Sequence, residues 1–407
     1  MSFHTRFAFR FSTVIIVILA ATSAPSVFHR LASISRQVLP STVKHPSQSS
    51  TMSSSYPKEL EVALLAVQRA SILTKQVFHA KSKGTLTKSD ASPVTIGDYG
   101  AQALIISALK HNFPSDEIVA EEESTDLQQD AALKDLVWNL VKETKLDDPS
   151  AETTLGGSIT DAESMLNIID QGNSKGGGKG RIWTIDPIDG TKGFLRGGQY
   201  AVCVALIVDG DVKVGVLGCP NLPVDDSAPL EGGIGENQSD AEGKGALASA
   251  VKGEGSQSRP LGTGKLQTPR KISVQSISTP SEAAFCESVE ANHSSHGDNA
   301  KIAKKLDITK PSVRMDSQAK YFSVARGAGD IYLRLPVRGG NYIEKIWDHA
   351  AGDLITRESG GTVTDIRGKS LDFSQGPLLT GNTGVVAAGS AIHAQVLKVV
   401  QEVLSVE

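Results

Sequence analysis

The sequence predicts an α/β protein with two structural units that follow an N-terminal extension. A chain of 407 residues favours two or more units over one. Apolar residues at helical spacing follow Pro57, and proline suits the first turn of a helix. From residue 271 onward, strand and helix patterns alternate, which is typical of an α/β layered architecture.

The first unit is predicted over residues 53–270 and mixes helices with strands. Helices are expected from Pro57, from Asp98 and over residues 125–145. Strands are expected over residues 118–120, 200–208 and 212–217. Asp209-Gly210 separates the last two strands and is a strong hairpin signal. The glycine-rich residues 172–180 predict a flexible loop, and residues 225–265 predict a long surface excursion.

The second unit is predicted over residues 271–407. A strand over residues 271–276 is expected to start it, and Ile331 to Leu335 predict a further strand. A helix over residues 348–359 is expected to end at Gly360-Gly361, before a strand at 362–365.

Composition narrows the function. The net charge of −4 does not favour a general nucleic-acid-binding surface. The three cysteines are too few and too scattered for a disulfide framework or a zinc site, so we expect small buried residues in a reducing compartment. The sequence has no Gly-x-x-x-x-Gly-Lys-Ser/Thr phosphate loop, which counts against a P-loop NTPase.

Residues 1–52 form the N-terminal extension and are excluded from the fold. Met1 to Lys58 contain no Asp or Glu, and the apolar run from Val14 to Ala21 is too short for a membrane span. The segment fits a secretory signal, a mitochondrial presequence, or an upstream extension before a start near Met52. We expect a cytoplasmic protein, or a mitochondrial one if the segment is a presequence.

The most informative segment is Asp186-Pro-Ile-Asp-Gly-Thr191, which follows an apolar strand. Two carboxylates that converge across a turn at Pro187 suit Mg²⁺, which prefers oxygen ligands and substrate phosphate. The carbonyl of Ile188 is a candidate further hard ligand, and Thr191 is a candidate cap for a following helix. An ordinary Asp-Pro-x-Asp-Gly turn without a ligand is the alternative.

Three other carboxylates stand at predicted element ends. Glu121 follows a short strand, although a solvated acidic turn fits equally well. Asp98 precedes an apparent helix, where an N-cap is the simpler interpretation. Asp348, in Trp347-Asp-His-Ala-Ala-Gly352, precedes small residues that let a helix pack tightly, and a helix cap is again the alternative. Together these carboxylates suggest hydrolysis of a phosphate ester with two metals.

Asp186-Pro-Ile-Asp-Gly-Thr191 and Trp347-Asp-His-Ala-Ala-Gly352 resemble the two signature motifs of the lithium-sensitive, Mg²⁺-dependent phosphatases of the inositol monophosphatase superfamily. Further segments resemble its 3′(2′),5′-bisphosphate nucleotidase branch. They are Ser92 to Tyr99, Gly193 to Gly197, Glu287 to His296, Asp316 to Tyr321 and Tyr332 to Pro336. The similarity runs over residues 56–400, with gaps at 145–180 and 225–265.

The resemblance implies a layered αβαβα sandwich and a role for each matching residue. Metal ligands would be Glu121, Asp186, the Ile188 carbonyl, Asp189 and Asp348. Asp98 and Thr191 would orient and deprotonate the attacking water. The nucleotide would be held by Thr191, His293, Ser317, Lys320, Arg334 and Asp348. Lys320 and Arg334 suit the phosphate that is not cleaved.

The resemblance thus implies a Mg²⁺-dependent, lithium-sensitive phosphatase that removes the 3′-phosphate of adenosine 3′,5′-bisphosphate. It would also act on 3′-phosphoadenylyl sulfate, in sulfur assimilation and nucleotide turnover. The partners implied are a small-molecule nucleotide, with no nucleic acid and no stable membrane span, on a monomer. The alternatives are an inositol phosphate phosphatase on the same scaffold and a non-catalytic nucleotide sensor.

Overall fold

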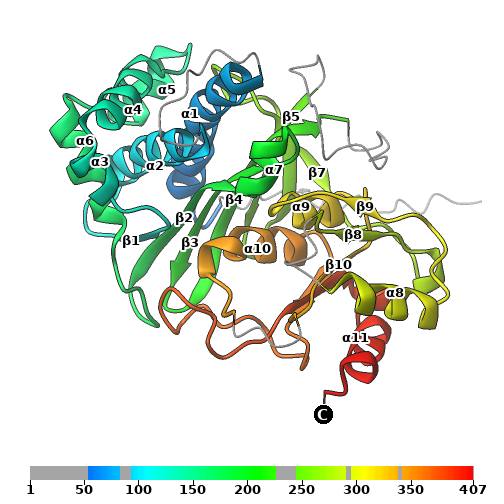
Figure 1. The fold of residues 1–407 in the computed structure, drawn as a ribbon. Helices are drawn as coiled ribbons and strands as arrows, with labels where there is room; N and C mark the ends of the chain where they lie inside the picture. Colours follow the sequence, from blue (N-terminus) through cyan, green and yellow to red (C-terminus); the bar gives the residue numbers. More distant parts are fainter. Residues whose placement is uncertain (1–53, 83–92, 226–243, 290–294, 338–341, 407) are drawn as a thin grey trace, which may run out of the picture. The chain divides into compact units, whose positions relative to one another are not determined.

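A computed structural model describes residues 54–82, 93–225, 244–289, 295–337 and 342–406 (Figure 1). The chain divides after Thr51, and the description concerns the unit Met52–Glu407. The predictions for residues 1–52 and for His293 lie outside the described residues. No helix in the described ranges is both long enough and apolar enough to span a bilayer.

The first sheet contains seven strands in chain order. They are β1 (Glu117–Ala120), β2 (Arg181–Asp189), β3 (Ala201–Val208), β4 (Asp211–Pro223), β5 (Lys244–Val251), β6 (Gly255–Pro260) and β7 (Arg270–Ile272). β1 and β2 are parallel, and every later pair is antiparallel. Asp209 (φ 51°) and Gly210 (φ 79°) make the predicted turn between β3 and β4, which suits the twist of a two-residue hairpin.

Two predictions for this region are wrong. Residues 225–265 are not one surface excursion, because they contain β5, which is buried over almost its whole length, and β6, which is half buried. The small side chains of Ala246, Ala248 and Ala250 are buried on one face of the sheet. A strand rich in such small residues has the composition of a loop, which explains the wrong prediction. The strand predicted at 271–276 is β7, which begins at Arg270 and pairs with β6 instead of starting the second sheet.

Helices α1 (Pro57–Ser82) and α2 (Pro93–Asn112) pack on one face of the first sheet. The start of α1 at Pro57 was predicted correctly. The predicted start of α2 at Asp98 is wrong: the helix begins at Pro93, so Asp98 lies in its second turn and is not an N-cap. Proline at the first helical position is compatible with a helix because its missing N–H has no intrahelical partner there.

Smaller helices pack beside α2 and complete this side of the molecule. They are α3 (Thr125–Gln129), α4 (Ala131–Glu143), α5 (Pro149–Thr154), α6 (Ala162–Ile169) and the 3₁₀ turn η1 (Asp170–Gly172). The helix predicted over 125–145 is therefore two helices. Asp130 separates them, because its side chain accepts hydrogen bonds from the N–H groups of Ala132 and Leu133 and caps α4.

The second sheet has the order β11-β12-β10-β8-β9. Its strands are β8 (Phe285–Glu287), β9 (Val313–Arg314), β10 (Ile331–Arg334), β11 (Gly361–Thr364) and β12 (Val385–Gly389). The remaining helical segments are α7 (Thr191–Arg196), η2 (Pro280–Glu282), α8 (His296–Lys305), α9 (Ala319–Ala325), η3 (Ile346–Asp348), α10 (Ala350–Glu358) and α11 (Ser390–Leu404).

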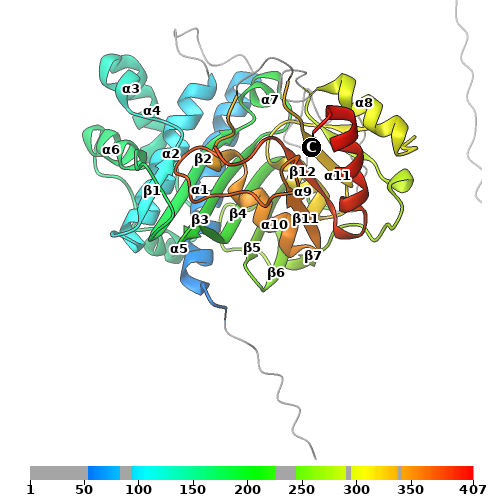
Figure 2. The same cartoon turned by 90° about the horizontal axis from the view of Figure 1, so that it is seen from below.

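The layers confirm the predicted αβαβα sandwich. α9 and α10 contact both sheets, so they form the middle layer (Figure 1). α8 and α11 cover the outer face of the second sheet, on the side opposite α1 and α2 (Figure 2). Fully buried Tyr321 and Leu354 occupy the middle layer, where burial of such side chains stabilises by about 1.5–3 kcal/mol each.

The small residues of the Trp347 to Gly352 segment let α10 approach its neighbours closely. A Cβ at Gly352 would lie 2.3 Å from Cδ2 of Tyr321 on α9. A Cβ at Gly215 on β4 would lie 2.9 Å from the carbonyl oxygen of Ala351. Real side chains would clash at these distances. The Ala-Ala-Gly sequence therefore fixes where the start of α10 lies against β4 and α9.

Candidate active site

Asp186 and Asp189 reach the same cavity because β2 contains a bulge between them. Asp186 pairs with Cys203, whereas Asp189 pairs with Ala201, so β2 has one extra residue over this stretch. Side chains alternate along a regular strand, and residues three apart face opposite sides. The extra residue restores a common side for the two carboxylates. Pro187 lies in the bulge and not in the predicted turn, and its missing N–H is tolerated there.

The chain turns sharply after Asp189. Gly190 has φ 90°, and a Cβ there would lie 2.9 Å from Cβ of Ser317, so this position requires glycine. Gly190 is the residue that precedes α7, and Thr191 is the first residue inside the helix. The predicted capping role of Thr191 is therefore wrong. Its side chain lines the cavity instead.

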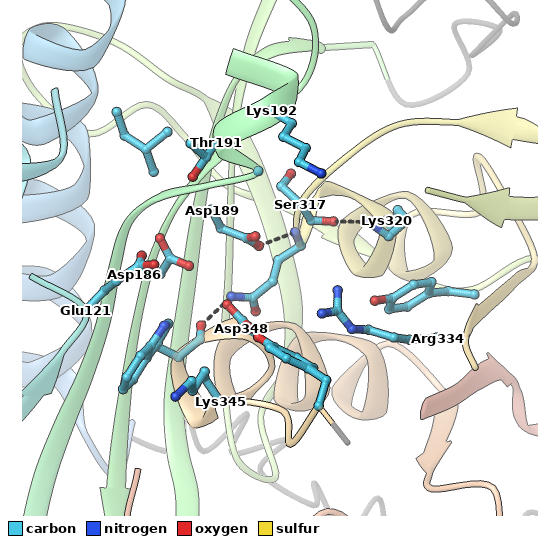
Figure 3. Close-up of a pocket in the computed structure, with 16 residues that line it drawn as sticks. Glu121, Asp186, Asp189, Thr191, Lys192, Ser317, Lys320, Arg334, Lys345 and Asp348 are labelled. Carbon is cyan, nitrogen blue, oxygen red and sulfur yellow. Dashed lines mark hydrogen bonds between the residues drawn. The ribbon is translucent and has the colours of Figure 1, made fainter. Parts of the chain in front are cut away.

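Glu121 and Asp98 reach the site from two other elements. Glu121 directly follows β1 and lines the cavity beside Asp186 (Figure 3). Asp98 is buried in α2 and does not line the cavity. Burial raises the pKa of Asp98 well above its usual range, and the charges of Glu122 and Glu121 raise it further. Asp98 thus lies outside the cavity and interacts with Glu122 and Glu121 through its charge.

Asp348 is the last residue of η3, in the middle layer, and Gln318 connects it with β2. The backbone N–H of Gln318 donates to Oδ2 of Asp189 at 2.5 Å. The Gln318 side chain donates to the carbonyl of Trp347 at 2.7 Å and accepts from the N–H of Gly352 at 2.8 Å. One buried residue therefore sets the position of Asp189 relative to the segment that carries Asp348.

These elements enclose a cavity of about 340 Å³, which is within the range of small-molecule sites. Figure 3 shows Glu121, Asp186 and Asp189 on one side and Lys320 and Arg334 on the other. The predicted residues that line it are Glu121, Asp186, Ile188, Asp189, Thr191, Ser317, Lys320, Arg334 and Asp348. Among the described residues, Asp98 is the only predicted site residue that does not line the cavity.

The acidic half of the cavity is electrostatically strained without a cation. Burial raises the pKa of Asp186 well above its usual range, and Glu121, Asp189 and Asp348 raise it further. Burial and Asp348 also raise the pKa of Asp189 to about 7, against the opposing charge of Lys320. Like charges at this spacing cannot all ionise unless a cation neutralises them.

The acidic half fits a hard divalent metal ion. Ligand oxygens of Asp186, Asp189 and Asp348 lie within 4.8 Å of one another. Within the described ranges, the buried Oδ1 of Asp186 has no hydrogen-bond partner, and a buried polar atom normally has one. An all-oxygen donor set of this kind suits Mg²⁺.

A second group, Glu344, Asp348 and His349, is equally close but differs in character. Glu344 already accepts from Nε of Arg334 at 2.7 Å and contacts Nε2 of His349 at 3.1 Å. These interactions outweigh the cost of burial and hold the pKa of Glu344 at about 2. Glu344 and His349 therefore belong to a hydrogen-bond network outside the cavity, whereas Asp348 lines it.

The cationic half is built from α9 and β10. Lys320 is buried, and its ammonium group donates to the carbonyl of Ser317 at 2.9 Å. Ser317 adopts φ 70°, which turns the chain into α9. The Arg334 guanidinium lies 5.6 Å from the ring centroid of Tyr342. Burial lowers the pKa of Lys320, and Asp316 and Asp189 oppose that effect. The two cations therefore face the carboxylates across the cavity.

The segment Gly193 to Gly197 supports the start of α9. Arg196 forms an ion pair with Asp316, the residue before Ser317. A Cβ at Gly193 would lie 2.2 Å from the carbonyl oxygen of Gln199 and 2.9 Å from Cβ of Asp316. α7 can therefore lie against the 316–320 segment only with glycine at this position. This contact fixes the position of Thr191, on α7, relative to Lys320, on α9.

Sequence reasoning missed several residues of the site. Unassigned residues that line the cavity are Gly190, Lys192, Gln318, Tyr332, Tyr342, Lys345 and Trp347. Gly190, Gln318, Tyr332 and Trp347 lie inside segments that the sequence had singled out, so proximity in sequence was an available signal for them. Tyr342 is 63% exposed, and nothing in its local sequence distinguishes it from any surface tyrosine.

The fold and the acidic cavity define a class of protein. The profile of the inositol monophosphatase family matches residues 57–405. The chain therefore belongs to the inositol monophosphatase family, which is a family of phosphatases.

Individual relatives that are similar to most of this chain carry a more specific name than the family. A 3′(2′),5′-bisphosphate nucleotidase of Emericella nidulans is 61% identical over 86% of this chain and 99% of its own. One of Schizosaccharomyces pombe is 48% identical over 86% of this chain and 97% of its own. The 3′,5′-bisphosphate nucleotidase 2 of Arabidopsis thaliana is 42% identical over 87% of this chain and 99% of its own.

Solved structures agree on the fold. An inositol monophosphatase from Zymomonas mobilis has a TM-score of 0.53 at 17% identity, over 86% of this chain and 100% of that chain. The inositol monophosphatase of Thermotoga maritima has a TM-score of 0.51 at 19% identity, over 85% and 98%. These likenesses concern the architecture and confirm the predicted sandwich.

Proposed function

We propose that this chain is a Mg²⁺-dependent phosphatase that hydrolyses the 3′-phosphate of adenosine 3′,5′-bisphosphate to give AMP and phosphate. The observation that carries the proposal is the division of one cavity into two halves. Three carboxylates that fit a metal face two cations, Lys320 and Arg334, across the same space. A substrate with two phosphate groups matches this arrangement. One phosphate would lie at the metal held by the carboxylates, and the other would pair with Lys320 and Arg334. The similarity to 3′(2′),5′-bisphosphate nucleotidases supports the same substrate class.

Each residue of the acidic half has a proposed role. Asp186, Asp189, Asp348, Glu121 and the Ile188 carbonyl would hold Mg²⁺. Bound there, Mg²⁺ would lower the pKa of a water molecule and neutralise charge on the phosphoryl group.

Asp98 and Thr191 would act on the attacking water. Burial and the charges of Glu122 and Glu121 raise the pKa of Asp98, so its ionised carboxylate would be a stronger base than an exposed one. Thr191 lines the cavity at the start of α7, where its hydroxyl would accept a hydrogen bond from the water. Lys320, Arg334, Ser317 and His293 would orient the nucleotide. The sulfated analogue, 3′-phosphoadenylyl sulfate, carries the same 3′-phosphate and would also be hydrolysed.

The test is phosphate release by the purified full chain. We expect turnover of adenosine 3′,5′-bisphosphate that requires Mg²⁺, stops with EDTA and falls with Li⁺. Inositol 1-phosphate, assayed in parallel, should be hydrolysed more slowly. Faster hydrolysis of inositol phosphates would favour the inositol phosphatase alternative. Tight nucleotide binding without phosphate release would favour a sensor.

A further inference from the structure

Glu344 lies behind the cavity wall and joins three of the elements that build the cavity. One carboxylate oxygen accepts from Nε of Arg334, on β10, at 2.7 Å. The other contacts Nε2 of His349, the residue after Asp348, at 3.1 Å. The opposite ring nitrogen of His349 lies 2.9 Å from the hydroxyl of Tyr321, the residue after Lys320. The chain of contacts thus connects Arg334, Asp348 and Lys320.

The donor is fixed in the contact between His349 and Glu344. A carboxylate only accepts, so Nε2 of His349 carries the hydrogen that it donates to Glu344. Nδ1 of the ring is paired with the Tyr321 hydroxyl, which can either donate or accept. His349 is 1% exposed and Tyr321 is 1% exposed, so water does not compete for these contacts. Buried networks with every member satisfied hold side chains in one geometry.

Glu344 also fixes which part of Arg334 faces the ligand. It engages the Nε edge of the guanidinium, and the guanidinium carbon lies over the Tyr342 ring. Figure 3 shows the guanidinium pointing into the cavity. Its terminal nitrogens form a planar fork, which matches two oxygens of a phosphate. A freely rotating arginine would have to lose rotamer freedom on binding.

We propose that Glu344 is a positioning residue for the second phosphate of the substrate. It holds the Arg334 fork at a set distance from Asp348 and Lys320. This assignment rests on the proposed function, since it concerns the phosphate that is not cleaved. The consequence is a preference for bisphosphates over monophosphates that Glu344 supports without touching the substrate.

The test compares adenosine 3′,5′-bisphosphate with adenosine 3′-monophosphate as substrates of the full chain. Glu344→Gln keeps the shape of the side chain but removes its charge. We expect the ratio of kcat/KM for the bisphosphate to that for the monophosphate to fall about tenfold, mainly through KM for the bisphosphate. Glu402→Gln is the control, because Glu402 has a partner, Lys305, on the outer layer and should leave the ratio unchanged.

A second comparison separates positioning from general destabilisation. Arg334→Ala should lower the same ratio, and adding Glu344→Gln to it should cause no further fall, because Glu344 acts through Arg334. Additive losses in the ratio would overturn the assignment, as would an unchanged ratio in Glu344→Gln. If the unmodified chain does not hydrolyse the bisphosphate at all, the proposed function fails, and that result is distinct from an active enzyme in which Glu344 has no effect.

Discussion

The backbone N–H of Gln318 donates a hydrogen bond of 2.5 Å to the carboxylate of Asp189, across 129 residues of sequence. The same residue contacts both ends of the turn from η3 into α10 through its side chain. Gln318, which is 2% exposed, therefore links the strand that carries Asp189 to the segment that carries Asp348. The geometry of the acidic half depends on this contact, because Asp186 and Asp189 come from one element and Asp348 comes from the other.

Replacing Gln318 with methionine should loosen this connection. The change keeps the volume but leaves the Trp347 carbonyl and the Gly352 N–H without their partner. Each unsatisfied buried group costs about 1–3 kcal/mol, so we expect the free energy of unfolding to fall by about 2 kcal/mol or more. The Mg²⁺ concentration for half-maximal activity should rise. Urea denaturation and a Mg²⁺ titration measure the two effects.

Gln401→Met is the control for Gln318→Met. Gln401 donates to the carbonyl of Ile366 at 3.2 Å from α11, outside the cavity. It should lower the free energy of unfolding by about 1 kcal/mol and leave the Mg²⁺ titration unchanged. Equal Mg²⁺ titrations for both variants would contradict the role given to Gln318.

Asp186→Asn should change activity and metal-free stability in opposite directions. Turnover should fall about 1000-fold or more, because a proposed metal ligand is lost. The metal-free protein should become more stable by about 1 kcal/mol, because a buried carboxylate no longer faces like charges. Phosphate release and thermal unfolding in EDTA measure the pair. A metal-free variant that is less stable than the parent would show that Asp186 is not strained by its neighbours.

Metal-free stability should depend on pH through Asp189. Its pKa is raised from 3.8 to about 7 in the folded chain, so the folded state holds this proton more tightly than the unfolded state. The resulting stability is complete below the unfolded value and is lost as the pH rises through the folded value. Stability relative to Asp189→Asn should thus fall between pH 4 and 7, by up to about 1.4 kcal/mol per pH unit.

Urea denaturation of both proteins across this pH range, in EDTA and then in Mg²⁺, measures the difference. Saturating Mg²⁺ should flatten the fall, because the ion favours the charged carboxylate. A difference between the proteins that stays constant with pH in EDTA would contradict the raised pKa of Asp189.

Local patterns predicted most of the elements and the acidic residues, because these depend on neighbouring residues alone. The start of α1 at Pro57, the Asp209-Gly210 hairpin and the apolar run of β2 are all local signals. The bulge that brings Asp186 and Asp189 to one side was not predictable, since it exists only in the pairing of β2 with β3. A turn at Pro187 was the natural but wrong inference.

The burial of charged side chains was the other feature that local sequence could not predict. Lysine is almost never fully buried without a partner, so from local sequence alone Lys320 is expected on the surface. The structure buries it to 3% exposure, because Ser317 and Asp316 supply an acceptor and a countercharge from the turn before α9. The role of Glu344 was not predicted for the same reason, since its contacts with Arg334 and His349 form only in the folded chain.

Gly193→Ala should damage the site through packing alone. The new Cβ would lie 2.2 Å from the carbonyl oxygen of Gln199, and backbone cannot move away as a flexible side chain can. We expect the free energy of unfolding to fall by about 1–3 kcal/mol. KM for the nucleotide should rise, because α7 would shift from the Asp316 to Lys320 segment.

Gly297→Ala is the matched control, because Gly297 lies in α8 with nothing within 4 Å of its added Cβ. That change should stabilise the chain by about 0.4–1 kcal/mol through the unfolded state. Thermal unfolding and substrate titrations of the two variants test the pair. A Gly193→Ala protein as stable as Gly297→Ala would mean that α7 can move without cost. The Gly193 to Gly197 segment would then have to act on the nucleotide by direct contact, and not by supporting Lys320.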